Sequence, residues 1–339
     1  MEYSVQFRNP QLLTSKCTIL QPVKLIVKWL KTILISIGII VILALFLFGH
    51  RDIPLDELKA KYASEPSAFV KINGMDVHYR DEGSSSDSIP IVLIHGTGSS
   101  LHTFNDWANA LKKEYRVIRM DLPGYGLTGP FPERDYSIEA YLEFVKDFLD
   151  KKNLDQCILG GNSLGGHIAW RFASIYPQRV SKLILINSAG YPNKSKSEPI
   201  AFRVAKTPVL KNALTFITPK SIARSSIENV YADKTKVTDE LVDRYFELTL
   251  RAGNRQAFID RFSIKSDPEA HKQISSIEQP ALVLWGDRDQ LIPVENAKRF
   301  QRDLPNDTLI VLENSGHVPM EESPERSLDA LRSFLVADD

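Results

Sequence analysis

Cysteine is scarce in this sequence. The 339 residues include two cysteines, Cys17 and Cys157, which are too few for a disulfide framework or a cysteine-rich zinc site. An excess of one charge is also lacking, because 42 Lys and Arg residues balance 42 Asp and Glu residues. No overall basic surface for nucleic acid is therefore indicated. Charged residues make up 25% and hydrophobic residues 43% of the chain, as in an average globular protein, which argues against a collagen-like or largely disordered chain.

One long hydrophobic run stands out near the N-terminus. Residues 32–49 form a stretch without any charged side chain. A helix of this length spans about 27 Å, close to the hydrocarbon thickness of a bilayer. Lys24, Lys28 and Lys31 precede the run. We therefore predict a transmembrane anchor at 32–49, preceded by a basic tail at 1–31.

The lysines before this run also bear on its orientation. Cytoplasmic segments close to a membrane span are enriched in Lys and Arg, so we expect a single-pass protein with its N-terminus in the cytoplasm. The difference in basic charge across the run is modest, because Arg51, Lys59 and Lys61 follow it. The side of the membrane on which the rest of the chain lies therefore stays open. A cleaved signal peptide is the alternative. Against it, the stretch before the run is long and no small-residue cleavage site follows Phe48.

From residue 68 onward the sequence alternates between short apolar runs and helical stretches, after a predicted polar linker at 50–67. A hairpin with an Asn73-Gly74 turn opens this region, and a fully apolar run at 91–94 is typical of a buried parallel strand. The other expected strands are 115–120, 157–159, 182–186, 281–285 and 308–312, and the expected helices are about 103–113, 137–151, 164–176, 293–303 and 322–336. This alternation predicts an α/β fold, with a mostly parallel central sheet covered by helices on both faces.

One interval breaks the alternation. Far more residues separate the strands expected at 182–186 and 281–285 than a parallel crossover needs. A structureless loop of this length is improbable in a compact domain, and much of the interval has a helical pattern. We therefore predict a helical cap insertion at 191–276, which divides the core into a first part at 68–190 and a second part at 277–339.

A candidate nucleophile lies in the segment 161–165, GNSLG. It fits the pattern G-x-S-x-G, follows an apolar strand and precedes a helix. A serine on such a sharp strand-to-helix turn needs small neighbours, because its backbone is strained, and it lies at the positive end of the helix. An ordinary glycine-rich turn is the alternative. Together with the residues described next, the pattern predicts Ser163 as a nucleophile.

A serine hydroxyl needs a base, and His317 is the candidate. It follows the last expected strand, and loops after parallel strands gather at the edge of the sheet where Ser163 emerges. Asp287 and Asp289 follow the penultimate strand, and both are candidates for the carboxylate that orients the histidine. The chain order Ser, Asp, His is the one expected for a serine on such a turn.

Fixed hydrogen-bond donors for a carbonyl oxygen are expected in the loop 95–98, HGTG. The loop directly follows the apolar strand at 91–94. It brings the backbone N–H of Thr97 opposite that of Leu164, and these two groups form the predicted oxyanion hole. His95 is interpreted as a structural residue that supports the loop.

These segments resemble the α/β-hydrolase family. The resemblance covers about residues 68–337 and rests, in the family's order, on IVLIHGTGSS, RVIRMDLPGYGLT, ILGGNSLGG, ALVLWGDRDQLIP and ENSGHVPMEESP. It implies that the acid of the triad is Asp289, four residues before Pro293, and leaves Asp287 as the alternative. It also implies a serine hydrolase that works through an acyl-enzyme and requires no metal and no organic cofactor.

The combination of an N-terminal anchor with this domain looks like membrane-anchored monoacylglycerol hydrolases and related bacterial lipases. It implies a hydrolase of carboxylic esters that acts on a small-molecule ester or lipid at a membrane, with no nucleic-acid partner. The oligomeric state is not predicted. Apolar residues of the cap are candidates to line a channel for an acyl chain, although packing of the cap onto the sheet explains them equally well: Phe202, Val204, Val209, Leu210, Leu214, Phe216 and Ile217.

Three other functions stay open. A carbon–carbon bond hydrolase of diketone-type substrates would use the same triad, but such enzymes often carry a tryptophan after the triad histidine, where this chain has Val318. Acyl transfer to an acceptor other than water would pass through the same acyl-enzyme. A binding module on an inactive hydrolase fold is disfavoured, because such proteins usually lose a triad member or a glycine of the turn.

Overall fold

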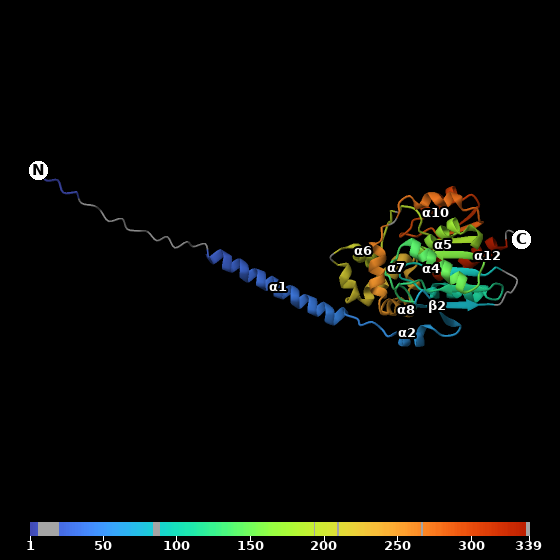
Figure 1. Cartoon of the computed structure of the whole chain (residues 1–339), viewed down its shortest axis with the longest axis horizontal. Helices are drawn as coiled ribbons and strands as arrows, with labels where there is room; N and C mark the ends of the chain where they lie inside the picture. The colour runs from blue at the N-terminus through green and yellow to red at the C-terminus, as the bar shows by residue number, and fades with distance from the viewer. Residues whose placement is uncertain (6–19, 84–88, 193, 209, 266, 337–339) are drawn as a thin grey trace. The chain divides into compact units, whose positions relative to one another are not determined.

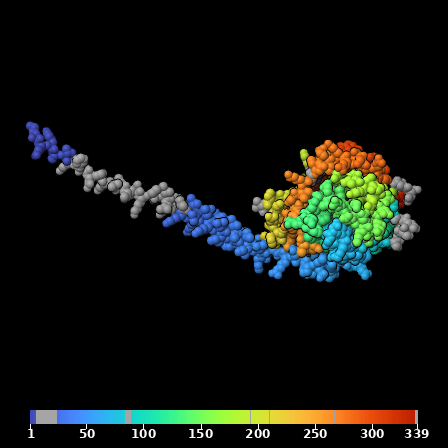
Figure 2. All heavy atoms as spheres, in the orientation of Figure 1, coloured from blue at the N-terminus to red at the C-terminus, as the bar shows by residue number. Residues whose placement is uncertain are grey.

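The computed structural model describes residues 1–5, 20–83, 89–192, 194–208, 210–265 and 267–336. The chain divides into two compact units, Met1–Gly49 and His50–Asp339. Figure 1 labels some of the elements of the two units, and Figure 2 shows the heavy atoms. The tail residue Cys17 lies outside the described residues.

The N-terminal unit contains one long helix, α1, which runs from Leu20 to Phe48. Its part from Lys24 to Phe48 is long and apolar enough to cross a membrane. The helix begins well before the span expected at 32–49, because the lysines and leucines that precede the span are good helix formers. Length and composition alone fit either a membrane span or a signal sequence.

The second unit is built on an eight-stranded sheet with the strand order β1-β2-β4-β3-β5-β6-β7-β8. β1 and β2 form an antiparallel hairpin, β2 pairs antiparallel with β4, and the other neighbouring strands are parallel. The strands are β1 (Ser67–Ile72), β2 (Met75–Glu82), β3 (Ile91–Ile94), β4 (Val117–Met120), β5 (Cys157–Asn162), β6 (Val180–Ile186), β7 (Ala281–Gly286) and β8 (Asp307–Leu312). The predicted α/β fold with a mostly parallel sheet is confirmed.

Helices cover both faces of the sheet, and the side chains of β3 alternate between them. Val92 and Ile94 belong to an apolar cluster with α4, α5 and α10, whereas Ile91 and Leu93 pack with α3 and α12. Apolar residues at every position are expected of a strand that is buried on both faces. The helices of the core are η1 (Leu101–Phe104), α3 (Asn105–Leu111), α4 (Ile138–Lys151), α5 (Leu164–Ile175), η2 (Pro177–Arg179), α10 (Glu295–Asp303), α11 (Pro319–Glu322) and α12 (Pro324–Leu335).

Most expected elements are present, with ends that differ by a few residues. β5 reaches Asn162, three residues beyond the expected strand, because these residues still pair with β6. The helix expected at 103–113 is divided into the 3₁₀ helix η1 and α3. The helix expected at 322–336 begins at Pro324, since proline is favoured in the first turn of a helix and cannot continue one.

Residues 50–67, expected to form a polar linker, pack on the domain instead. They contain helix α2 (Leu55–Tyr62), whose Leu58 is buried in a small apolar cluster. Before this helix, the N–H of Ile53 donates to the carbonyl of Leu250 at 2.9 Å. In Figure 2 this segment forms the blue lower margin of the domain. A single buried leucine among charged residues gives too weak a pattern to predict such a helix.

The interval between β6 and β7 is helical, as expected for a cap. Its helices are α6 (Ile200–Lys206), η3 (Lys211–Thr215), α7 (Lys220–Val230), η4 (Lys234–Lys236), α8 (Asp239–Thr249), α9 (Asn254–Ser263) and η5 (Ala270–Ser276). The cap contacts the loops that follow β3 and β4: Tyr245 bonds to Ser99 at 3.2 Å, and Arg251 donates to the carbonyl of Leu127 at 3.0 Å. Figure 1 shows α6, α7 and α8 beside one end of the sheet. The cap therefore covers the edge where the candidate site residues are expected.

Candidate active site

Ser163 lies at a sharp turn between β5 and α5, with φ 55° and ψ −111°. Few non-glycine residues adopt a positive φ, so the backbone of this serine is strained. Its N–H donates to the carbonyl of Ile186 at 3.0 Å, which ties the turn to β6. The flanking glycines allow the turn, because a Cβ on Gly161 would lie 2.2 Å from the backbone of Gly165. A Cβ on Gly165 would lie 2.0 Å from the carbonyl oxygen of Ile94, so glycine is required at both positions.

His317 and Asp289 are brought together from two loops. Nδ1 of His317 lies 2.6 Å from Oδ2 of Asp289, and both side chains are buried. The other carboxylate oxygen of Asp289 accepts the N–H groups of Leu291 and Ile292, each at 2.9 Å. The carboxylate is therefore fixed by its own loop as well as by the imidazole. An imidazole that donates from Nδ1 to a carboxylate has Nε2 as its basic nitrogen.

Asp287, the alternative acid, has different neighbours. Its Oδ1 accepts the N–H of Ser315 at 3.4 Å, and Oδ2 lies 3.6 Å from Nε of Arg288. The side chain of Asp287 is 30% exposed, whereas that of Asp289 is fully buried. Of the two aspartates, the one that contacts His317 is therefore Asp289.

The turn at Ser163 and the loop of His317 are joined through Asn162. Nδ2 of Asn162 donates to the carbonyl of His317 at 2.9 Å and to that of Ile186 at 3.1 Å. Within the described part of the chain, the Ser163 hydroxyl makes no hydrogen bond to His317. In enzymes without substrate such bonds are often long and tighten on binding. The structure brings the two loops together, while the contact between Ser163 and His317 stays a prediction.

Loop 95–98 lies against the turn at Ser163. A Cβ on Gly96 would lie 3.2 Å from the Cβ of Ser163, so the backbone of the loop passes directly beside the serine. Leu164 is the first residue of α5, and its N–H is therefore at the positive end of that helix. The loop of Thr97 and the amide of Leu164 thus lie close to Ser163. The oxyanion hole that they would form stays a prediction.

Both ring nitrogens of His95 are used by the backbone. Nδ1 lies 2.8 Å from the carbonyl oxygen of Gly96, and Nε2 accepts the N–H of Leu122 at 3.0 Å. Complete burial lowers the pKa of His95, so the ring is neutral near pH 7. These contacts fit the structural role expected for His95 and leave neither nitrogen available for catalysis.

Asp121, which follows β4, has a role that sequence reasoning missed. Its carboxylate accepts the N–H groups of Leu101 and Leu127, both at 2.8 Å, and lies 2.7 Å from Nδ1 of His78. Burial alone would raise the pKa of Asp121, but His78 and other nearby histidines hold it below its usual range. One buried carboxylate thus fixes the loops that follow β3 and β4. The position of Asp121 directly after an apolar strand is the feature of the sequence that would have indicated this role.

Two more buried polar residues that sequence reasoning missed support the site. Asn187 follows β6, and its Nδ2 donates to Oδ2 of Asp289 at 2.7 Å. Glu322 accepts the N–H of Gly316, beside the candidate base, at 2.7 Å. The other carboxylate oxygen of Glu322 accepts the N–H of Asp233 in the cap at 2.7 Å. The position of Asn187 at the carboxyl end of a strand could have indicated its role from the sequence. The position of Glu322 in a short helix gives no such indication.

His167 is a histidine close to Ser163 in sequence, one helical turn away. Its ring stacks on that of Trp170, with centroids 5.1 Å apart. Burial, together with Arg261 and Arg171, lowers the pKa of His167 to about 3. Within the described residues its Nε2 has no hydrogen-bond partner, and no carboxylate pairs with the ring. His167 therefore lacks the orienting acid that His317 has.

An apolar cavity of about 140 Å³ begins at Thr97 and Gly98 and extends into the cap. Its walls come mainly from apolar side chains of α6 to α9 and η3, among them Phe202, Leu214, Ile227, Phe246 and Phe258. Arg255 is the cation among the described lining residues, and it pairs with Asp52 at 2.7 Å. The cavity therefore offers mostly hydrocarbon surface next to the loop of the predicted oxyanion hole.

Only some of the expected channel residues lie in the cavity. Phe202 and Leu214 line the cavity. Leu210 and Phe216 are instead 52% and 65% exposed, because they lie on the outer surface of the cap. The remaining members do not contribute to the described lining: Val204 and Ile217 are half-buried elsewhere, and Val209 lies outside the described residues.

Among the described residues, no group of three or more His, Cys, Asp or Glu side chains could hold a metal ion. The residues predicted to act together are a serine, a histidine, an aspartate and two backbone amides, and of these residues Thr97 lines the cavity. Nucleophilic acyl transfer uses this set.

Comparison with known proteins gives the same fold. The family profile of the alpha/beta hydrolase fold matches residues 89–324. The 2-hydroxy-6-oxononadienedioate/2-hydroxy-6-oxononatrienedioate hydrolase of Paraburkholderia phymatum is 30% identical over 269 residues, which cover 76% of this chain and 90% of that protein.

Two solved structures are also similar. A membrane phospholipase A, described as a bacterial virulence factor, is 24% identical with a TM-score of 0.69, covering 93% of this chain and 98% of its own. A thermophilic esterase from Thermogutta terrifontis is 25% identical with a TM-score of 0.66, covering 79% of this chain and 96% of its own. The family profile spans most of the domain, from β3 to the start of α12, and includes the turn at Ser163 and the loops of Asp289 and His317. On this evidence the chain belongs to the alpha/beta-hydrolase family.

Proposed function

We propose that this chain is a membrane-anchored serine hydrolase of carboxylic esters, with monoacylglycerols and related lipid esters as its substrate class. The observation that carries the proposal is the apolar cavity that begins beside Thr97 and continues into the cap. An acyl chain whose carbonyl carbon lies beside Ser163 would extend into this cavity. Burial of its methylene groups would stabilise the complex by about 0.8 kcal/mol for each group.

In the first half of the reaction His317 acts as the base through Nε2, since its Nδ1 contacts Asp289 at 2.6 Å. It takes the proton of Ser163 as Oγ attacks the carbonyl carbon of the ester. The amides of Thr97 and Leu164 stabilise the negative charge that develops on the carbonyl oxygen. When the ester C–O bond breaks, the imidazolium gives its proton to the leaving alcohol, and the acyl group stays on Ser163.

In the second half water takes the place of the alcohol. His317 removes a proton from the water molecule as its oxygen attacks the acyl carbon. The same two amides hold the oxyanion, and the imidazolium then protonates Oγ of Ser163 as the carboxylic acid leaves. Loss of one amide donor from such a hole reduces the rate by roughly a hundred- to a thousand-fold.

The apolar helix α1 supports the membrane attachment. Lys24 to Phe48 has the length and composition of a membrane span. The similarity to the bacterial membrane phospholipase A covers 93% of this chain. Residues 50–339 alone are a smaller share of the chain, so the similarity includes part of the N-terminal unit. We propose a single span with the N-terminus in the cytoplasm. A C-terminal tag should then resist protease in inside-out vesicles and be digested in right-side-out vesicles, and the reverse pattern would overturn this topology.

Hydrolysis of monoacylglycerols from short to long acyl chains tests the proposed activity. The full-length protein in detergent should turn them over with a rate that rises with chain length, and Ser163→Ala should abolish turnover. A fluorophosphonate probe should label the native protein and not Ser163→Ala. Labelling of Ser163 without turnover of any ester would retain the serine hydrolase and discard the lipid-ester assignment.

Carbon–carbon bond hydrolysis is the second candidate, favoured by the similarity to the hydrolase of Paraburkholderia phymatum. The name of that enzyme describes substrates with two carboxylates. In this chain the cation of the cavity, Arg255, is already paired with Asp52, which favours an uncharged chain as the occupant. Loss of the absorbance of a 2-hydroxy-6-oxo-dienoate measures this activity directly. Turnover of such a compound without turnover of esters would put this candidate first.

A further inference from the structure

Three apolar side chains on the outer surface of the cap are exposed. Ile200, Leu210 and Phe216 are 42%, 52% and 65% exposed, and they are not among the residues that line the cavity. They lie on α6 and at the two ends of η3, and these two elements pack against each other. Large exposed apolar side chains on neighbouring elements are typical of a contact with a partner or a membrane.

The same part of the cap is strongly basic. Residues 194–220 contain one acidic residue, Glu198, which pairs with Lys206. Six basic residues lie in this segment: Lys194, Lys196, Arg203, Lys206, Lys211 and Lys220. Lys196 and Lys220 pair with Glu295 and Asp243 outside this segment. Lys194 and Arg203 are exposed and form no ion pair with an acid in the described part of the chain. A surface that combines apolar and basic side chains matches the interface of a bilayer with anionic headgroups.

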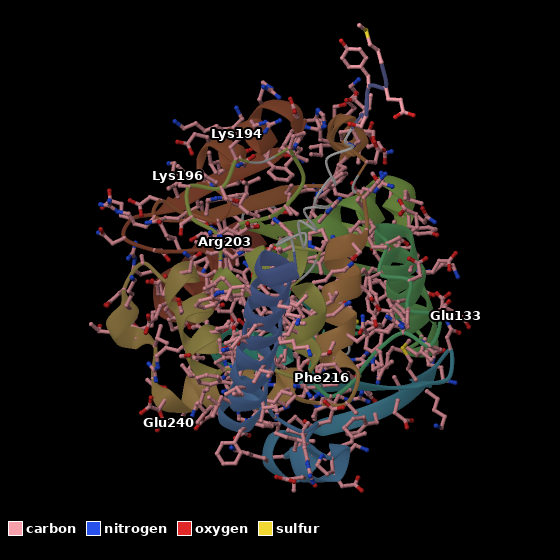
Figure 3. The ribbon with its side chains drawn as sticks, turned by 90° about the vertical axis from the view of Figure 1, so that its left-hand side faces the viewer. Glu133, Lys194, Lys196, Arg203, Phe216 and Glu240 are labelled. Carbon is pink, nitrogen blue, oxygen red and sulfur yellow. The ribbon has the colours of Figure 1, made fainter. Side chains whose placement is uncertain are left out.

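Figure 3 shows how the charges are distributed around this surface. Arg203 and Phe216 lie near the middle of the face in view, and Lys194 and Lys196 lie above them. The labelled acidic residues, Glu133 and Glu240, lie towards its margins.

The first residues of the domain are bound to this surface. We call residues 50–53 the strap. The N–H of His50 donates to the carbonyl of Phe216 at 3.2 Å. At the other end of the strap, Ile53 bonds to the carbonyl of Leu250 at 2.9 Å. The chain that follows α1 is therefore fixed directly beside the exposed Phe216.

The strap also contacts the wall of the cavity. The ring of His50 packs edge-on against that of Phe246, with centroids 5.0 Å apart. Asp52 pairs with Arg255 at 2.7 Å. Phe246 and Arg255 both line the cavity. The strap thus contacts both the exposed Phe216 and the wall of the cavity.

We propose that the surface formed by Ile200, Leu210, Phe216 and the surrounding basic side chains docks on a bilayer that contains anionic lipids. The proposal rests on the proposed anchoring by α1 and goes beyond it, because an anchor alone leaves the domain free to turn. His50 is the second residue after the end of α1, so its bond to Phe216 keeps this docking surface near the point where the chain leaves the bilayer. The apolar side chains enter the headgroup region, and the basic ones contact lipid phosphates. A lipid substrate then reaches the cavity without crossing bulk water.

A polarity-sensitive fluorophore on Phe216→Cys tests this docking in the full-length protein reconstituted in vesicles. Cys17→Ser removes the competing thiol of the tail, and Cys157 is buried. The matched control is the same label on Val336→Cys, because Val336 is 60% exposed and follows α12, on the far side of the domain from α6 in Figure 1. Thermal unfolding checks that each variant is folded.

In vesicles of phosphatidylcholine and phosphatidylglycerol, the label at position 216 should shift to the blue and be quenched several-fold by lipids brominated on their acyl chains. The label at position 336 should do neither. Replacement of both Arg203 and Lys211 by glutamate should reverse the shift. Protein that fails to float with the vesicles would refute the anchoring itself. Protein that floats while the label at position 216 stays in water, or responds equally in phosphatidylcholine alone, would refute the docking and leave the proposed anchoring intact.

Discussion

Asn187 donates from Nδ2 to Oδ2 of Asp289 at 2.7 Å, and the same oxygen lies 2.6 Å from Nδ1 of His317. Asn187 therefore fixes the direction of the carboxylate that orients the proposed base. Hydrogen bonds to charged groups contribute about 1.5–3 kcal/mol. For Asn187→Ala we expect kcat to fall about ten- to a hundred-fold with little change in KM, since the substrate does not contact this side chain.

Steady-state kinetics with a monoacylglycerol measure this effect. Asn109→Ala is the control, because Asn109 is an exposed asparagine on α3 whose side chain bonds to Lys112. A kcat that is equal in the Asn187 and Asn109 variants would show that the loop of Asp289 holds the carboxylate without help.

The two aspartates after β7 provide a matched pair. Asp289→Asn should lower kcat about 10⁴-fold, because an amide at this position favours the wrong tautomer of His317. Asp287→Asn should change kcat less than about threefold, since its carboxylate contacts Ser315 and Arg288 instead. Both rates are measured on the same ester after thermal unfolding has shown that the variants are folded. If Asp287→Asn has the larger effect, the assignment of the acid is wrong.

The cavity predicts a dependence on chain length. Ala223, on α7, is one of its lining residues, and a phenylalanine there would occupy much of the volume of about 140 Å³. For Ala223→Phe we expect kcat/KM for a long-chain monoacylglycerol to fall at least about tenfold, whereas a short-chain ester keeps most of its rate. Ala213→Phe is the control, because Ala213 is exposed on η3. An equal loss on both esters would mean that the acyl chain does not occupy this cavity.

His102 should make stability depend on pH. It is buried, with Nε2 2.9 Å from the carbonyl oxygen of Tyr62 in α2, and burial lowers its pKa to about 3. In the unfolded chain the pKa is about 6.5, so between these two values the unfolded state binds a proton that the folded state does not. The free energy of unfolding should therefore be unaffected by this group above about pH 6.5 and fall as the pH decreases towards about 3.

The variant His102→Gln keeps an N–H donor for the carbonyl of Tyr62 and does not titrate. Its melting temperature should therefore fall less steeply than that of the native protein between neutral pH and about pH 4. Thermal unfolding in detergent at a series of pH values measures both slopes. Parallel slopes would contradict the assignment of this pH dependence to His102.

The parts of the fold that follow from local pattern were predictable. The run at 91–94 is short and apolar at every position, which is typical of a strand buried on both faces. Ser163 is flanked by the glycines that its strained backbone requires. Because parallel strands end at one edge, the loops after β7 and β8 had to meet there, and Asp289 and His317 do meet.

Contacts between residues far apart in sequence could not be predicted in this way. Asn162 bonds to the carbonyl of His317, and Asp121 bonds to His78, but a single polar residue after an apolar strand carries no periodicity that names its partner. The strap was missed for a related reason. Its attachment at Phe216 depends on the path of the cap, which follows no repeating pattern.

Glu322 has a consequence for the motion of the cap. Its two oxygens bond to Gly316 and Asp233, and the N–H of His317 donates to the carbonyl of Val230 at 2.7 Å. These bonds join the C-terminal end of α7 to the loop that holds the proposed base, so this end of the cap is a fixed pivot. An opening movement that began there would move His317 away from Asp289. An opening movement of the cap that keeps the proton-transfer groups aligned is therefore expected to leave this end of the cap in place.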